Sequence, residues 1–325
     1  MTTGWLKALR LNPMPTLHAW QDPALSYFTR RDLSREQVGA VEKLWEMPAA
    51  RKIIARQQAD GSWSYAGKTI SHETGTNYAL LETYRNLRLL VEMHGLHSEH
   101  PCLQRAVEYV FTCQTEEGDI RGILGNQYMP YYHGAILELV VKAGYTGDPR
   151  LEKGLEWLLS VRQADGGWLV PTQAMPSKQR TRQYWLGAPY KTDLQKASSQ
   201  LATGMALRAF TVHPTYCRHP QVKTAAIYLK GRFFMADHYP DRKAPSYWLK
   251  FQYPFWWSNL LTALDSLSLL GFSRQDGQVQ QGLDWFLAHQ SDDGLWETGY
   301  GSGRGAEESR RWVGLAVCRV LERLI

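Results

Sequence analysis

The chain has 325 residues, of which 44% are hydrophobic, so it is long enough to bury a large core, and it contains no apolar run of the roughly 20 residues that a membrane-spanning helix needs. The formal net charge of +6 suits an anionic small molecule, a membrane surface or nucleic acid, but no dense run of Lys and Arg occurs, so no nucleic-acid partner is expected. The four cysteines form no CxxC pair and lie far apart, which argues against a disulfide framework and a zinc site and predicts no metal.

The N-terminal segment, residues 1–35, is predicted to be helical, with short helices over residues 4–11 and 22–31. It begins MTTGWLKALRLNPMP, which lacks the apolar core of a signal peptide. We therefore expect a cytoplasmic protein, with membrane association by peripheral contact as an open option. The two short helices would supply a sixth helical pair to the five that follow.

Five further pairs of helices are predicted along the chain, one helix before and one after each of a series of turns. The helices before the turns are amphipathic and cover residues 36–56, 102–113, 149–161, 220–232 and 277–289. The helices after the turns are more apolar, several of them on most faces, as expected for helices surrounded by others, and cover residues 73–94, 128–144, 196–212, 256–270 and 306–324.

Four of the turns share one design. An acidic residue ends or caps a helix, a glycine allows the left-handed backbone that follows, and the last residue, a tryptophan in three copies, folds back over the joint. The copies are QQADGSW at 57–63, QTEEGDI at 114–120, RQADGGW at 162–168 and QSDDGLW at 290–296. Alternating amphipathic and buried helices close most simply into two concentric rings, so we predict an all-α fold, an α/α toroid with the second helices inside, formed by one domain over residues 1–325.

The repeated Gln, two residues, Asp or Glu, Gly, one residue, Trp resembles the signature of the squalene and oxidosqualene cyclases, within the prenyltransferase and squalene cyclase superfamily. This resemblance implies an α/α barrel whose central cavity accepts an isoprenoid. It also implies either a protonating Asp in a DXDD motif or, in the protein prenyltransferases, a zinc-bound thiol. Neither device is recognisable in this sequence, so the resemblance predicts the fold and does not specify the reaction.

Two loops that lead into inner helices carry candidate site residues. In KTISHETGTNY we nominate Glu73 as a catalytic acid and Tyr78 as a substrate contact, although a glutamate near a helix start is more often a partner of the helix end. In GNQYMPYYHGA, Tyr131 and Tyr132 are candidate substrate contacts. His133 is a candidate general base, with a structural core histidine as the favoured alternative.

The longest connection, residues 169–196, is predicted to be a basic loop or lid, because connections of this length commonly cover binding sites. Arg180 and Arg182 in it suit a diphosphate or another anionic headgroup, and Trp185 could cover an apolar tail. A solvated basic loop is the alternative. Asp193 is the acid that we nominate first as a proton donor.

A run of aromatic residues, WLKFQYPFWWSN, precedes the fourth inner helix, and its Trp256, Trp257 and Asn259 are candidate substrate contacts. Core packing explains part of this run, and the rest is expected to form an aromatic wall. The glycine-rich segment ETGYGSGRGAEESRRW follows no predicted strand, so it is not a dinucleotide or P-loop motif. Arg304 in it is a candidate anion contact.

These features together predict a protein that acts on or binds an isoprenoid or a similar apolar small-molecule substrate with an anionic headgroup, such as a diphosphate, in a central aromatic cavity. No cofactor is expected, and no protein partner can be named. Two alternatives stay open, namely a noncatalytic lipid- or ligand-binding toroid and a carbohydrate-active (α/α) barrel. The last would place two carboxylates facing each other, about 5 to 10 Å apart.

Overall fold

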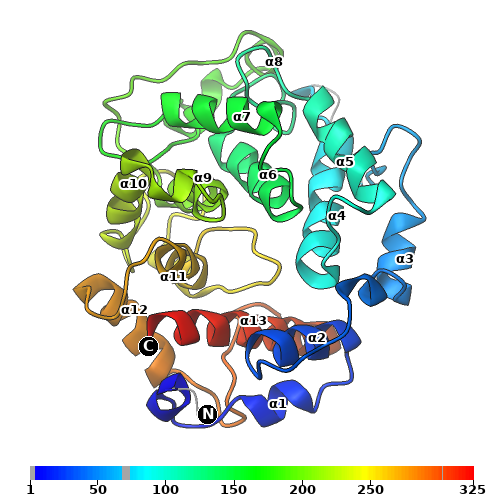
Figure 1. Cartoon of the computed structure of the whole chain (residues 1–325). Helices are drawn as coiled ribbons and strands as arrows, with labels where there is room; N and C mark the ends of the chain where they lie inside the picture. The colour runs from blue at the N-terminus through cyan, green and yellow to red at the C-terminus, as the bar shows by residue number, and fades with distance from the viewer. Residues whose placement is uncertain (1–3, 68–73, 302) are drawn as a thin grey trace.

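The computed structural model describes residues 4–67, 74–301 and 303–325, and all regular structure in this part of the chain is helical (Figure 1). It contains thirteen α-helices, and its only β-type pairings are four isolated bridges, two of them within the repeated turns. The predicted all-α toroid is confirmed. Helical hairpins follow one another around a centre, with one helix of each pair inside and the other outside (Figure 1).

Four outer helices begin in the same way, at a residue whose side chain accepts a hydrogen bond from the backbone N–H two positions further on. Their buried residues recur at helical spacing on one face, so each helix packs against the inner ring and exposes its other side. These helices are α5 (Pro101–Thr112), α7 (Pro149–Ser160), α10 (Pro220–Lys230) and α12 (Gly277–Ala288).

The inner helices are buried on most faces, and every residue of the third of them is buried. Two neighbours approach closely at Gly134, where an added Cβ would lie 2.6 Å from the Cα of Ala206. Small residues thus allow the backbones of α6 and α9 to touch. The inner helices are α4 (Tyr78–His94), α6 (Pro130–Lys142), α9 (Gln200–Thr211), α11 (Leu260–Leu269) and α13 (Arg304–Leu324).

The N-terminal region is more broken than the sequence predicted. The long helix expected over residues 36–56 is wrong, because Pro48 lacks a backbone N–H and restricts the residue before it, so only a 3-10 turn and a short helix form. The elements are η1 (Gly4–Ala8), α1 (Met14–His18), α2 (Pro23–Asp32), η2 (Val41–Leu44) and α3 (Pro48–Ile54). As Figure 1 shows, α1 and α2 lie against α13, so they complete the ring as a sixth pair.

The remaining short elements lie in the connections between the hairpins. They are η4 (Pro171–Ala174), η5 (Ser177–Gln179), α8 (Arg182–Leu186), η6 (Tyr216–Arg218) and η7 (Pro245–Leu249). None of the described helices combines the length and the apolar character needed to cross a membrane.

The four turns have the geometry that their sequence predicts. Each turn glycine has a positive φ, between 84° and 108°, at Gly61, Gly118, Gly166 and Gly294. In three turns the indole Nε1 of the tryptophan donates a hydrogen bond to the carbonyl oxygen ten residues earlier. These pairs are Trp63 with Ile53 (2.8 Å), Trp168 with Leu158 (2.7 Å) and Trp296 with Phe286 (2.7 Å).

The first glutamine of a turn joins its own hairpin to the next. The side-chain amide of Gln114 donates to the carbonyl of Gly118 in its own turn and to that of Arg150 in α7, both at 2.8 Å. Gln290 repeats this in the last turn, where the second acceptor is the carbonyl of Leu11 at 2.7 Å. The same kind of bond that links successive hairpins therefore also closes the ring onto the N-terminal segment.

Replacing Trp168 by Ala should lower the free energy of unfolding by about 3–5 kcal/mol, because the indole is fully buried and its N–H bond is lost with it. Urea denaturation followed by circular dichroism measures this. As a control, Trp20 is partly buried beneath Arg311 and lies outside any turn, so Trp20→Ala should cost only about 1 kcal/mol. Equal losses in the two variants would show that the turn tryptophans have no special structural role.

Candidate functional site

The aromatic residues nominated from two separate segments come together in the structure. Tyr131 and Tyr132 at the start of α6 meet Trp256 and Trp257 from the segment before α11, and Tyr84 of α4 joins them. Neighbouring ring centroids are 4.6 to 6.5 Å apart, which is the normal range for aromatic pairs. We call these five side chains the aromatic cluster.

The aromatic cluster is largely packed on itself. Tyr131 and Tyr132 are buried, and Trp256 and Trp257 are partly buried. Two clefts, of about 590 and 540 Å³, lie elsewhere, and neither is lined by a ring of the cluster. The rings of the cluster thus contact one another and border neither of these two clefts.

Two other residues nominated as substrate contacts, Tyr78 and Asn259, interact with neighbouring parts of the chain. Tyr78 begins α4, and its ring stacks on that of Tyr65 with the centroids 5.0 Å apart. Asn259 caps α11, where it accepts from the N–H of Thr262 at 3.0 Å and donates to the carbonyl of Lys250 at 2.9 Å. Because these bonds use both ends of its amide, Asn259 is a helix cap and is not free to bind a ligand.

His133 is held in the core, as the alternative interpretation had it. Its Nδ1 accepts a hydrogen bond from the N–H of Ile120 and its Nε2 bonds to the carbonyl of Gly154, both at 2.9 Å. Burial lowers the pKa of this histidine to about 4, so it is neutral near pH 7. Both ring nitrogens are thus hydrogen-bonded to the backbone, which favours the structural interpretation of His133 over its nomination as a general base.

Of the two nominated acids, the structure describes only Asp193. Asp193 is exposed on the lid, where it accepts from the N–H of Gln195 at 2.9 Å within its own turn, so it is not a buried proton donor. Glu73 lies outside the described residues, and so does the side chain of Arg304.

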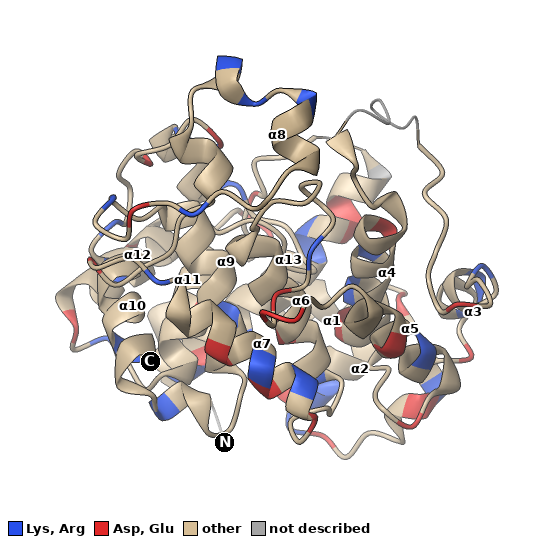
Figure 2. Ribbon diagram, turned by 90° about the horizontal axis from the view of Figure 1, so that it is seen from above, with Lys and Arg blue, Asp and Glu red and all other residues tan. Residues whose placement is uncertain are grey.

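The predicted lid is tied to the ring by amide contacts. Gln127 donates to the carbonyl of Tyr184 and accepts from the N–H of Tyr190, at 2.6 and 2.9 Å. Gln163 donates to the carbonyls of Asp193 and Lys196, each at 3.0 Å. Figure 2 shows the lid rising from the ring at α8 with basic residues along it.

The basic and aromatic residues nominated on the lid face their own loop or solvent. Arg180 donates to the carbonyl of Met175 at 2.8 Å, and Arg182 is exposed at the start of α8. Trp185 packs edge-on against Tyr184 with the ring centroids 5.2 Å apart. None of these three nominated residues lines either cleft.

A cleft of about 540 Å³ lies between the lid and the end of α7, and we call it the lid cleft. Its wall includes Trp157 and Tyr128, whose ring centroids are 5.5 Å apart, and His133 supports Trp157 from behind. The other lining residues are half apolar and half polar, namely Pro130, Val161, Leu169, Pro171 and Leu194, and Glu117, Ser160, Gln163, Lys191 and Thr192.

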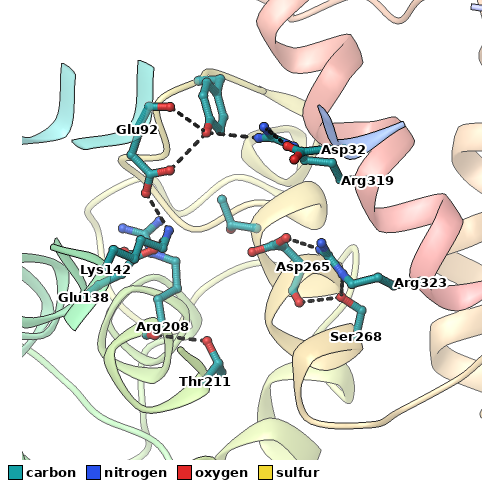
Figure 3. A network of polar contacts seen from close by, with 12 residues as sticks. Asp32, Glu92, Glu138, Lys142, Arg208, Thr211, Asp265, Ser268, Arg319 and Arg323 are labelled. Atoms are coloured by element: carbon teal, nitrogen blue, oxygen red, sulfur yellow. Dashed lines mark hydrogen bonds and ion pairs between the residues drawn. The ribbon is translucent and has the colours of Figure 1, made fainter. Parts of the chain in front are cut away.

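A second cleft of about 590 Å³, the floor cleft, lies at the C-terminal ends of α4, α6 and α13. Paired charges line it: Lys142 lies 2.5 Å from Glu92, and Arg319 binds Asp32. Tyr253 joins the two pairs, since its hydroxyl is 3.0 Å from Glu92 and 3.3 Å from Arg319 (Figure 3). The cleft wall is thus a connected polar network.

The network continues into the core through Glu138. Its two oxygens lie 2.8 Å from Lys142 and 2.8 Å from Arg208 of α9 (Figure 3). Burial alone would raise the pKa of Glu138, but Arg208 and Lys142 outweigh burial and lower it. This carboxylate is therefore ionised in the folded protein and holds α6 to α9.

Sequence reasoning missed Lys142, Arg208 and Glu92 as partners, although a signal was present. Glu138 and Lys142 are four residues apart on an apolar helix, and Arg208 stands alone in another. A charge in such a helix is costly unless it is paired. The pairing between helices could not be read from either helix by itself.

One grouping within the described residues could hold a metal ion. Ligand atoms of Glu42, His97 and Glu99 all lie within 4.8 Å of one another, and His97 Nε2 is 3.4 Å from Glu42 Oε1. These side chains are at least partly exposed, and exposed acidic groups gather in this way without an ion. No cofactor is assigned to them.

Comparison with known proteins supports the fold. Residues 79–204, from α4 to α9 and including the lid, match the family model of the squalene-hopene cyclase C-terminal domain, which confirms the resemblance predicted from the turns. No curated protein matches the chain significantly. The chain is also similar to a solved structure described as the crystal structure of a protein from Actinoplanes, with 18% identity over 87% of this chain and 86% of that one. The TM-score of this pair is 0.43.

Glu138→Gln should lower the free energy of unfolding by about 3–5 kcal/mol, because Arg208 then loses its buried counterion. Guanidinium denaturation at pH 7 measures this. The control is Glu82→Gln, which breaks a partly exposed pair with Arg85 and should cost only about 0.5 kcal/mol. Similar losses in both variants would contradict the structural role of the buried carboxylate.

The network also predicts a pH dependence. The pKa of Glu138 is lower in the folded than in the unfolded chain, so its contribution is complete above the ordinary value of 4.5 and is lost as the pH falls below it. Melting temperatures between pH 7 and pH 3 should therefore fall less steeply in Glu138→Gln than in the parent protein. Parallel curves would show that Glu138 contributes nothing to acid sensitivity.

Proposed function

We propose that this protein binds a linear apolar small molecule of the prenyl-chain class with one anionic end, and that the chain lies in the lid cleft. The observation that carries this proposal is the cleft itself. Its volume of about 540 Å³ falls within the usual range of ligand sites, and seven of its twelve lining residues are apolar or aromatic while five are polar.

The walls of the lid cleft suit a prenyl chain. Trp157 and Tyr128 offer aromatic surface on one side, and Leu169 and Leu194 offer aliphatic surface from the lid. Leu194 is 45% exposed, which is unusual for a large apolar side chain, and a ligand in the cleft would cover it. Covering this apolar surface would contribute favourable free energy to binding, because apolar surface is removed from water.

The charges of the cleft favour an anionic end. Lys191 is the lysine that lines it. Glu117 already accepts a hydrogen bond from the hydroxyl of Tyr128 at 2.6 Å and lies 3.5 Å from Arg121. The oxygens of Glu117 are thus engaged, whereas Lys191 is exposed and makes no ion pair within the described residues. A negative headgroup on the ligand would pair with the ammonium group of Lys191.

Binding is better supported than cyclisation or glycoside hydrolysis. The lid cleft is lined by a single carboxylate among the described residues, Glu117, and glycoside hydrolysis normally uses two facing ones. A cyclase needs a free acid to protonate the chain, and Glu117 is hydrogen-bonded instead. We therefore propose the noncatalytic, ligand-binding form of the predicted function.

Leu194→Asp should weaken binding of a fluorescent prenyl probe at least about tenfold, because a carboxylate would be desolvated against the apolar chain. The matched control is Leu269→Asp, since Leu269 is similarly exposed, at 40%, and lies outside the cleft. Fluorescence titration gives both affinities. An unchanged affinity in Leu194→Asp, or an equal loss in the control, would place the ligand elsewhere.

Lys191→Glu should weaken binding of farnesyl diphosphate by several-fold and leave binding of farnesol nearly unchanged, because only the diphosphate uses the lysine. Competition titrations against the same probe measure both ligands, and raising the salt concentration should reduce the difference between them. If both ligands lose affinity equally, Lys191 contributes packing and not charge recognition.

A further inference from the structure

A buried arginine in the centre of the ring lacks a counterion. Arg88 of α4 is only 7% exposed, and its guanidinium lies over the ring of Trp256 at 4.3 Å. No carboxylate of a described residue lies within 4.0 Å of it, and its Nε and Nη1 atoms have no hydrogen-bond partner in that part of the chain. Buried polar groups normally have partners, so this exception needs an explanation.

Two more groups with unused donors face the same place. Tyr84, one turn before Arg88, is fully buried, and the guanidinium of Arg88 lies 5.8 Å from the centroid of its ring. Arg208 of α9 uses Nε in its ion pair with Glu138 and lies close enough to the Tyr84 hydroxyl for a hydrogen bond between them to lower the pKa of that tyrosine, which burial raises. As the acceptor of this bond, the Tyr84 hydroxyl keeps its own proton free to donate, and Arg208 keeps further N–H groups.

The local charge balance is positive. Arg88, Arg208 and Lys142 contribute three cations, and Glu92 and Glu138 contribute two carboxylates, which leaves one positive charge inside the ring. The two carboxylates already bind Lys142 and Arg208 (Figure 3). An unpaired charge in a protein interior is strongly destabilising, so a counterion from outside the chain would stabilise the fold.

We propose that the centre of the ring binds one small monovalent anion, such as chloride or formate, between Arg88, Arg208 and Tyr84. The unused groups are guanidinium N–H donors and a hydroxyl, which favour an anion over a cation or a neutral donor. The ion must be small, because Tyr84 and the buried ring of Phe255, 6.0 Å from Arg208, enclose the place.

This anion site is independent of the lid cleft. None of its three side chains lines either of the clefts described above. The guanidinium of Arg88 lies over the ring of Trp256, and its N–H groups are at its edge. The proposed anion would contact these N–H groups and not the aromatic rings. Loss of prenyl binding and loss of anion binding are thus separable outcomes.

The test is a thermal-shift titration of the full chain with sodium chloride, and separately with sodium formate, in which bulky gluconate keeps the ionic strength constant. Chloride at ten times its dissociation constant should raise the melting temperature by about 2 °C, and the rise should saturate. In Arg88→Met this rise should disappear. A rise that persists in that variant, or no anion-specific rise in the parent protein, would refute the site.

Two further variants keep the result interpretable. Arg85→Met is the matched control, because Arg85 is on the same helix, also lies over Trp256 and is already paired with Glu82, so its chloride response should equal that of the parent. Tyr84→Phe removes a single donor and should weaken chloride binding by about threefold to tenfold while the protein stays folded. An undiminished affinity in Tyr84→Phe would exclude the hydroxyl from the site and overturn the proposal.

Discussion

One hydrogen-bonded contact recurs in three of the four turns and orients the hairpins around the ring: the first glutamine of the turn joins its own turn to the segment that comes next around the ring. Hydrophobic burial holds the helices together, but it is non-directional and does not set the angle between hairpins. The amide of Gln57 does so by donating to the carbonyls of Gly61 and Cys102. The turn glycine permits this approach, because a Cβ on Gly61 would lie 2.2 Å from the carbonyl oxygen of Arg105. Repeating this angle leads the chain back to its start, where Leu11 accepts the last bond.

The sequence predicted the ring well because its determinants are local. The glycine of the turn is visible in all four copies, and in three of them the tryptophan that bonds to the carbonyl ten residues earlier is visible too. The ends of the inner helices were predicted less well. The fourth inner helix was expected from residue 256 but begins at Leu260, because Asn259 caps it and the aromatic run before it is not helical. Pro48 divides the first outer helix in the same local way, and both signals could have been read from the sequence.

The site was harder to predict, because the role of a polar side chain depends on partners that are distant in the chain. The sequence allowed His133 to be either a general base or a core residue. Its hydrogen bonds to the carbonyl of Gly154 and the N–H of Ile120, which favour the second interpretation, are visible only in the structure. The aromatic residues nominated as substrate contacts do lie together, but their rings contact one another. The lid cleft is lined instead by Trp157, a residue of an outer helix that the sequence did not single out as a contact. Trp157 lies near the end of α7, where its ring both packs against His133 in the core and lines the lid cleft.

The electrostatics of the centre explain why a cyclase-like fold need not carry cyclase chemistry. Aromatic faces stabilise a carbocation, and the cluster around Trp256 has such faces. Arg88 already occupies one of them at 4.3 Å. A carbocation about 5 Å from this fixed charge would be repelled by about 3 kcal/mol at an effective dielectric constant of about 20, which offsets what several ring contacts provide. The same guanidinium attracts an anion. If the noncatalytic function proposed above is right, the charge of Arg88 supplies a physical reason for it, because an unneutralised guanidinium in the middle of the ring would oppose the carbocation that a cyclase must stabilise.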